Sequence, residues 1–344
     1  AITGLDAGNG SWQYSTDGGA SWHTVSGVSA SNALLLADSD RIRFVPNGEN
    51  ATAGSLSYRA WDHSAGSAGN YADTSINGGT SAFSSQQNSM AIAVTAVNDA
   101  PLLAAAAPTL TPLTEDDIAN PGQTVASFLG STGSDVDAGA LGGIAITATN
   151  DGNGSWQYST DGGASWHSVS GLTGGNGLLL ADTDKIRFVP DGQNATSASF
   201  TYHAWDRSTG TAGSTADLSA ATAYGTNKAL NGDETAFSAS KQTATLTVAA
   251  VNDAPVLSAA APSFTTLTED QTTNAGQTVA SILGTSVTDP DTGASQGIAI
   301  TSLASGNGSW QYSTDNGSNW SAVGGVSATS ALLLRSTDKL RFIP

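Results

Sequence analysis

The sequence predicts an all-β protein that is built from tandem β-sandwich units. Three observations carry this prediction. Short segments with alternating apolar and polar residues recur along the chain, and glycine-rich turn sequences separate them. No stretch keeps an amphipathic helical period. One phrase of the sequence, at residues 11–22, returns unchanged at 155–166 and with three changes at 309–320.

The repeated phrase predicts a β-hairpin. Trp12 and Tyr14 alternate with polar neighbours, which is the pattern of a half-buried strand. Residues 16–19, Thr-Asp-Gly-Gly, favour a turn because glycine accepts positive φ and aspartate bonds to its own backbone. Residues 15–22 also resemble the Asp-box, a hairpin motif that occurs in sialidases and in many non-enzymes, where it locks a turn. The third copy departs from this motif at Asn319.

The spacing of the repeats divides the chain into three parts. Residues 102–255 form one complete unit, residues 1–101 the C-terminal part of a unit before it, and residues 256–344 the N-terminal part of the next. We therefore expect these residues to be an excerpt of a longer tandem array. The complete unit carries an insertion around residues 220–232, rich in glycine, threonine and polar residues, which we expect to be a surface loop.

Within the complete unit, apolar residues at alternating positions predict a steady series of short strands. These strands are expected at residues 106–113, 123–129, 144–149, 155–159, 165–169, 178–180, 185–190, 199–206 and 243–251. Residues 130–143 are expected to form a polar loop that carries Asp135 and Asp137.

Composition excludes several classes of partner. Lys plus Arg total 11 against 29 Asp plus Glu, which gives a net charge of −18 at pH 7. Such a surface repels nucleic acid and anionic membranes, and no apolar run is long enough to insert into a membrane. Cysteine is absent, which excludes disulfides and thiolate metal sites. The excess of carboxylates instead suits divalent cations. In an exported chain without cysteine, we expect bound calcium to provide the stabilisation that disulfides would otherwise provide.

Two further phrases recur at fixed places in the units. Val-Asn-Asp-Ala-Pro ends a unit at residues 97–101 and again at 251–255, and Leu-Thr-Glu-Asp stands early in the next, at 113–116 and 267–270. Together they resemble the cadherin-like repeats of giant bacterial surface adhesins of the repeats-in-toxin type. The resemblance implies Ig/cadherin-like β-sandwich units in an elongated array, a place at the bacterial cell surface or in the secreted fraction, and a role in cell adhesion.

The resemblance also implies calcium ligands between consecutive units, at a linker, at an early Glu and at an Asp-x-Asp loop. The positions that match are Asn98, Asp99, Glu115, Asp135, Asp137, Asn252, Asp253, Glu269, Asp289 and Asp291. Asp62 and Asp206, in the phrase Ala-Trp-Asp, are weaker matches to a further Asp-containing element. The Asp-Arg-Glu phrase that is typical of cadherins is missing, so the number of ions per junction stays open.

Elementary chemistry supports a cation at the junction as well. Calcium takes about six to eight oxygen ligands from carboxylates, amides and backbone carbonyls. We expect one junction to bring together Asn98, Asp99, Glu115 and Asp137, whose three carboxylates would repel one another without a cation. The alternative is that Asn-Asp-Ala-Pro is only a turn into the next strand and that the acids are solvated.

Other residue patterns have simpler interpretations. The pairs Asp38/Asp40 and Asp182/Asp184 are expected to be charged turns, because Ser336 replaces the first aspartate in the third copy. The four histidines show no zinc spacing and no arrangement with Ser and Asp that recurs. The recurring tryptophans stand at alternating strand positions, where core packing is the simpler role and sugar binding the alternative.

The function expected from the sequence is structural rather than enzymatic: a calcium-stiffened repeat segment of a large extracellular adhesin or surface filament. The alternative is a glycan-binding module that uses the Trp-rich hairpin face for host or matrix glycans. A sialidase-type enzyme is not expected, since the complete unit has only Arg187 and Arg207 to bind a substrate carboxylate. Neighbouring repeats of the same chain are the expected partners, and exposed sheet edges would favour self-assembly into filaments.

Overall fold

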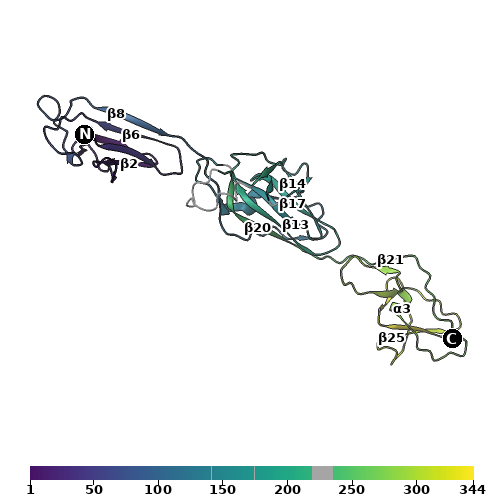
Figure 1. The fold of residues 1–344 in the computed structure, drawn as a ribbon. Coiled ribbons are helices and arrows are strands. Elements are labelled where there is room, and N and C mark those ends of the chain that lie inside the picture. Colours follow the sequence, from purple (N-terminus) through teal and green to yellow (C-terminus); the bar gives the residue numbers. More distant parts are fainter. Residues whose placement is uncertain (141, 174, 219–234) are drawn as a thin grey trace. The chain divides into compact units, whose positions relative to one another are not determined.

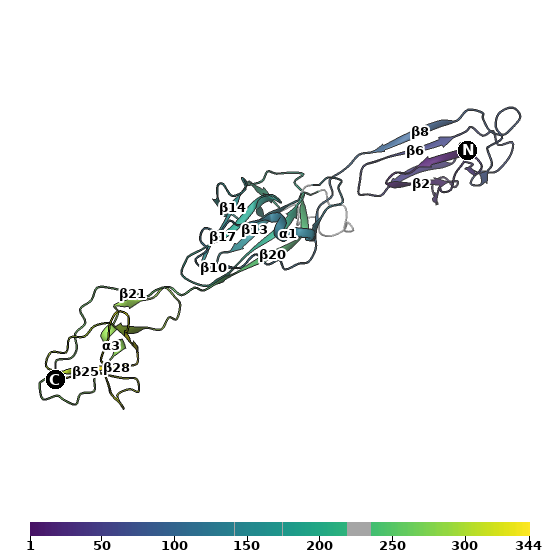
Figure 2. The same cartoon turned by 180° about the vertical axis from the view of Figure 1, so that it is seen from behind.

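The computed structural model describes residues 1–140, 142–173, 175–218 and 235–344, and this part of the chain is nearly all β (Figures 1 and 2). The all-β prediction is confirmed. The chain divides into two compact units. The first comprises Ala1–Thr111, Asn120–Phe188 and Ala198–Leu246, and the second comprises Pro112–Ala119, Val189–Ser197 and Thr247–Pro344. These units are not the sequence repeats, whose boundaries stay a prediction.

The first 101 residues form two sheets. One has the strand order β7-β4-β1-β6-β8 and the other β3-β2-β5. The strands are β1 (Ile2–Asp6), β2 (Gly10–Ser15), β3 (His23–Thr24), β4 (Ala33–Leu34), β5 (Arg41–Pro46), β6 (Thr52–Tyr58), β7 (Tyr71–Ala72) and β8 (Asn88–Val94). Ile2, Trp12, Val25, Leu34 and Leu56 form the buried core between them.

Residues 102–255 contain a six-stranded sheet, β10-β20-β18-β13-β16-β19, a four-stranded sheet, β11-β17-β14-β15, and the pair β12-β9. The elements are β9 (Leu102–Leu103), β10 (Leu113–Thr114), β11 (Gln123–Thr124), α1 (Val125–Leu129), the 3₁₀ turn Gly130–Thr132, β12 (Gly133–Ser134), β13 (Gly143–Asn150), β14 (Gly154–Ser159), β15 (His167–Ser168), β16 (Asn176–Ala181), β17 (Lys185–Pro190), β18 (Thr196–Trp205), β19 (Thr215–Asp217) and β20 (Phe237–Ala249). Most of the strands predicted for this repeat are confirmed to within a few residues.

Aromatic side chains from both large sheets meet in the core of this repeat. Trp156 of β14 lies edge-on to Phe188 of β17, with ring centroids 5.2 Å apart, and to Phe200 of β18 at 5.0 Å. All three side chains are almost completely buried. Because β18 belongs to the other sheet, these contacts pack the two sheets face to face, as in a β-sandwich.

A short helix, α1 (Val125–Leu129), corrects the prediction that residues 123–129 form a strand. Only Gln123 and Thr124 are in a strand, and the chain then turns into α1, which packs beside β13 (Figure 2). Val125, Phe128 and Leu129 are buried at positions i, i+3 and i+4, which is the spacing of a helix. A segment of only five residues is too short for this spacing to be distinguished from a strand pattern. The equivalent segment in the last part of the chain is α3 (Val279–Leu283).

The strand predicted at residues 106–113 is also shorter than expected. Only Leu113 and Thr114 form β10, and Thr109 makes a single parallel bridge to Thr245. Pro108 and Pro112 have no N–H to donate to a sheet, which limits the pairing to separated contacts. The surface loop predicted at residues 220–232 lies outside the described residues.

The last part of the chain repeats the hairpin sheet in the order β22-β28-β25-β26 and adds the pairs β21-β23 and β24-β27. The strands are β21 (Val256–Leu257), β22 (Gln277–Thr278), β23 (Val287–Thr288), β24 (Gly297–Ile300), β25 (Ser309–Ser313), β26 (Ser321–Ala322), β27 (Leu332–Arg335) and β28 (Lys339–Ile343). Val279, Leu283, Leu334 and Leu340 form its buried core. Among the residues described, no helix has the length and apolar character needed to cross a membrane.

Candidate metal site

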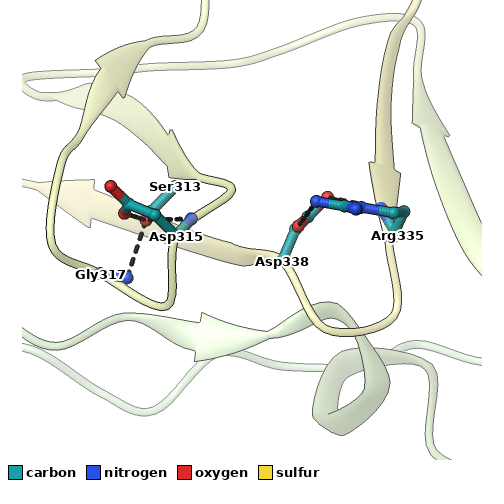
Figure 3. A network of polar contacts seen from close by, with 5 residues as sticks. All are labelled: Ser313, Asp315, Gly317, Arg335 and Asp338. Atoms are coloured by element: carbon teal, nitrogen blue, oxygen red, sulfur yellow. Dashed lines mark hydrogen bonds and ion pairs between the residues drawn. The ribbon is translucent and has the colours of Figure 1, made fainter.

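The three hairpin turns that the sequence singled out are closed by hydrogen bonds. In the third copy, Ser313 Oγ accepts the N–H of Gly317 at 2.8 Å and donates to Asp315 Oδ1 at 2.7 Å (Figure 3). The backbone N–H and side-chain amide of Asn319, followed by the Ser313 hydroxyl, lower the pKa of Asp315 to about 2. Every carboxylate oxygen of Asp315 therefore has a donor, and the turn needs no ion.

The Asp-x-Asp pairs before the following strand also form turns, as predicted. The second aspartate of each pair accepts a backbone N–H: Asp40 from Ala37 at 2.8 Å and Asp184 from Ala181 at 2.7 Å. In the third copy Asp338 accepts the N–H of Arg335 at 2.8 Å and pairs with its guanidinium at 3.1 Å (Figure 3).

The linker at residues 97–101 meets carboxylates from two later segments. The N–H of Asp99 donates to Asp137 Oδ2 at 2.8 Å, and the N–H of Asp137 donates to Asp135 Oδ1 at 2.8 Å. Asn98 Nδ2 donates to Asp206 Oδ2 at 2.9 Å. We call these five residues, Asn98, Asp99, Asp135, Asp137 and Asp206, the first acidic group.

Burial makes the first acidic group electrostatically unfavourable. Asp99 and Asp206 are only 7% and 6% exposed, and Asp135 Oδ2 is buried without a hydrogen-bond partner. Burial raises the pKa of Asp135, and the charges of Asp137, Asp206 and Asp99 raise it further. A cavity of about 240 Å³ lies beside Asp135 and Asp206, with Trp205 in its wall.

The second linker, at residues 251–255, meets a comparable set. The N–H of Asp253 donates to Asp291 Oδ2 at 3.1 Å, and the N–H of Asp291 donates to Asp289 Oδ1 at 3.0 Å. Carboxylate oxygens of Glu115, Asp253 and Asp291 all lie within 4.8 Å of one another. We call Glu115, Asn252, Asp253, Asp289 and Asp291 the second acidic group; the three clustered carboxylates belong to one compact unit.

Glu115 reaches the second linker because β10, an early strand of its repeat, pairs with β20, the last strand of that repeat. β10 runs parallel to the end of β20, with Leu113 beside Val248 and Thr114 beside Ala249. The N–H of Glu115 continues this ladder to the carbonyl of Ala249 at 3.0 Å, and its Oε1 accepts the N–H of Val251 at 2.6 Å. The start of the repeat is thereby fixed to the linker that ends it.

The carboxylates of the second acidic group lack donors at the point where they converge. Glu115 is 0% exposed and its Oε2 has no hydrogen-bond partner, and Asp253 Oδ2 is likewise buried and unpartnered. Burial raises the pKa of Asp253, and the charges of Asp291, Asp116 and Asp289 add to that effect. Oxygen atoms in this arrangement fit a hard divalent cation, which prefers carboxylate and carbonyl ligands.

The structure therefore corrects one expected grouping. Glu115 lies with Asp253 and Asp291 rather than with Asn98, Asp99 and Asp137, because the parallel β10–β20 pair carries it to the far end of its own repeat. Glu269, its counterpart in the next repeat, is exposed and belongs to neither group. Asp206, only a weak match in the sequence, belongs to the first acidic group, and the recurring Trp-Asp phrase was its signal.

Comparisons with protein-family models, with curated proteins and with solved structures found no match to this chain. The cadherin-like resemblance consequently stays an expectation from the recurring phrases, and the geometry of the acidic groups carries the functional argument.

Proposed function

We propose that this chain is a repeat segment of a large extracellular adhesin or surface filament, with cadherin-like β-sandwich units that calcium stiffens at their junctions. The observation that carries the proposal is the second acidic group, in which buried, unpartnered oxygens of Glu115 and Asp253 face a third carboxylate from Asp291.

The energetics of this group favour a bound cation. A buried carboxylate without a donor is costly, and neighbouring carboxylates add repulsion that shows as a raised pKa. A divalent cation replaces the missing donors and neutralises two of the charges. Glu115, Asp253 and Asp291 would hold the ion, with Asp289 and Asn252 in support.

The connectivity of the ligands suggests a mechanical role. Glu115 follows β10, an early strand of the complete repeat, Asp253 lies in the linker, and Asp291 lies in the repeat that follows. An ion bound to all three joins segments that the chain connects only through the linker. Ion binding to the folded state alone would also stabilise it by mass action.

The test uses the complete 344-residue chain with a matched pair of variants. Calcium binding is measured by titration calorimetry after chelator treatment, and hydrodynamic radius is followed with and without calcium. We expect Glu115→Gln to abolish the tightest binding step. Glu269→Gln changes the same repeat position where the carboxylate is exposed, and should leave that step intact.

Two results would contradict the proposal. One is a melting temperature and a hydrodynamic radius that are the same in calcium and in chelator. The other is an equal loss of binding in Glu115→Gln and Glu269→Gln, because that would place the ion outside the second acidic group.

A further inference from the structure

The positive charges of this acidic chain are concentrated on one face of each hairpin sheet. The chain has 11 Lys and Arg residues. Two positions on the strand that follows each hairpin hold six of them: Arg41 and Arg43 on β5, Lys185 and Arg187 on β17, and Lys339 and Arg341 on β28. Residues two apart on a strand point to the same face, so the members of each pair lie side by side.

The second member of each pair is held in one orientation. Nε and Nη2 of Arg187 both donate to Gln157 Oε1, at 2.9 and 2.7 Å, and its guanidinium lies 4.1 Å from the ring centroid of Trp166. Arg43 with Gln13 and Trp22, and Arg341 with Gln311 and Trp320, repeat this arrangement with stacking distances of 3.9 Å. A guanidinium that is already ordered loses little entropy when it binds an anion.

The first member of each pair has spare binding capacity. In the described part of the chain, the side chains of Arg41 and Lys185 make no hydrogen bond or ion pair, and Lys339 Nζ bonds only to the carbonyl of Asn316, at 3.1 Å. Arg187 uses three of its N–H groups, two on Gln157 and one on the carbonyl of Asn120. Two of the five N–H groups of its guanidinium therefore remain for a ligand.

The first cation of each pair lies beside the turn glycine of its hairpin, but among the described residues it bonds to the turn only in the third copy, where Lys339 Nζ donates to the carbonyl of Asn316. The Arg–Gln–Trp stack uses only the second member, yet the first position is basic in every copy, as Arg or as Lys. The same stack covers one face of each tryptophan with a guanidinium, so that face is closed to a sugar ring. The cations are therefore part of the accessible chemistry of this surface, on the side where the guanidinium covers the indole.

We propose that each of these basic pairs binds a carboxylate, and that the carboxylates belong to a uronic-acid polysaccharide. Two parallel N–H groups of a guanidinium match the two oxygens of a carboxylate, and the neighbouring cation adds charge. A single exposed pair binds weakly, but the same pair recurs in every repeat, so a polymer with a carboxylate on each sugar can engage several at once. Nucleic acid, with one charge per about 1.7 Å of duplex, would be repelled more strongly by the net charge of −18.

The test measures binding of the complete chain to immobilised polygalacturonate, in chelator, so that calcium cannot bridge the polymer to the acidic groups. Fully methyl-esterified polygalacturonate is the matched ligand without carboxylates. The variant Arg41→Gln/Lys185→Gln/Lys339→Gln removes the first cation of each pair, and with it one hydrogen bond of the fold, from Lys339 Nζ to the carbonyl of Asn316. We expect it to bind at least about tenfold more weakly, since three contacts on one polymer are lost together. Lys241→Gln, an exposed basic residue on β20, is the control and should bind as the unmodified chain does.

Several outcomes would overturn the inference: no binding of polygalacturonate by the unmodified chain, equal binding of the methyl ester, or undiminished binding by the triple variant. The carboxylates could instead come from the acidic surface of a second copy of this chain. Sedimentation of the same proteins without polysaccharide tests that source. If the unmodified chain self-associates and the triple variant does not, the basic pairs bind the acidic surface of a second copy, and the polysaccharide is the wrong partner.

Discussion

Asp161 lies in a hairpin turn and Asp253 in the second linker, and their carboxylates have opposite surroundings. Asp161 Oδ1 accepts the N–H of Ser165 at 2.9 Å, and the hydroxyls of Ser165 and Ser159 also donate to the carboxylate. These bonds, led by the Ser165 hydroxyl, hold the pKa of Asp161 far below its usual range. Asp253 instead has a buried Oδ2 without a partner, and burial and neighbouring carboxylates raise its pKa.

The difference separates a structural turn from a candidate binding site within one repeat. A carboxylate surrounded by donors is complete in the protein alone, and its charge stabilises the fold. A carboxylate surrounded by other carboxylates is complete only with a cation. The most recognisable phrase of the sequence therefore closes the turn of each hairpin, and we propose that the less conspicuous Asn-Asp-Ala-Pro linker carries the binding chemistry.

The largest expected difference between the hairpin turn and the second acidic group is in how calcium changes the free energy of unfolding. At a free concentration 100 times the dissociation constant, a ligand that binds only the folded state adds about 2.7 kcal/mol to the free energy of unfolding. We expect this increment, measured by thermal unfolding, in the unmodified chain and in Ser159→Ala. An unchanged increment in Glu115→Gln would show that the ion binds elsewhere.

Removing the serine of a hairpin turn should destabilise the chain whether or not calcium is present. Ser159 is 0% exposed, and its Oγ accepts the N–H of Gly163 at 2.8 Å while it donates to Asp161. Ser159→Ala leaves the N–H of Gly163 without this partner and removes one of the donors to Asp161, which costs about 1–3 kcal/mol. Denaturant unfolding measures the loss, and Ser168→Ala, at an exposed position on β15, is the control. A loss that calcium restores would contradict the assignment of Ser159 to the turn alone.

Neutralising one aspartate in each region should change stability in opposite directions. In chelator, Asp161→Asn removes a carboxylate that three donors satisfy, so the melting temperature should fall. Asp253→Asn relieves repulsion with Asp291, Asp116 and Asp289, so the melting temperature should rise. Scanning calorimetry of both variants gives the signs directly. If both variants melt lower than the unmodified chain, Asp253 is not under electrostatic strain.

The dependence of stability on pH should contain two opposing contributions, which are the smallest effects expected. Asp135 and Asp253 have raised pKa values in the folded chain, so without calcium their contribution to stability is fully present below the ordinary Asp pKa and is lost as pH rises through the raised values. Asp315 has a pKa lowered to about 2, so its contribution is present above the ordinary value and is lost as pH falls towards 2.

Urea unfolding between pH 2 and 7 in chelator tests this prediction. We expect stability to be greatest near pH 4 and to fall on both sides. Calcium should remove the decline between pH 4 and 7, because it stabilises the charged carboxylates. A decline of the same size in calcium would show that the loss of stability between pH 4 and 7 does not come from the acidic groups.

The strands and hairpins could be predicted because local residues decide them. Alternation of apolar and polar residues indicated β17 within its observed bounds, and Thr-Asp-Gly-Gly indicated the turn after β14, where Gly162 and Gly163 have φ of 77° and 102°. The helix α1 was missed because its five residues are too few for the spacing of Val125, Phe128 and Leu129 to identify a helix, and burial of these residues decides its conformation.

By itself the sequence determined the all-β class, the hairpin turns and the residue types of the junction, since recurring phrases and turn chemistry depend only on neighbours in the chain. Only the tertiary structure decided which carboxylates meet. Glu115 lies far along the chain from Asp253, and the parallel pairing of β10 with β20 brings them together. Pairing between an early strand and the last strand of a repeat is a long-range contact that packing decides, so the composition of the second acidic group became visible only in the fold.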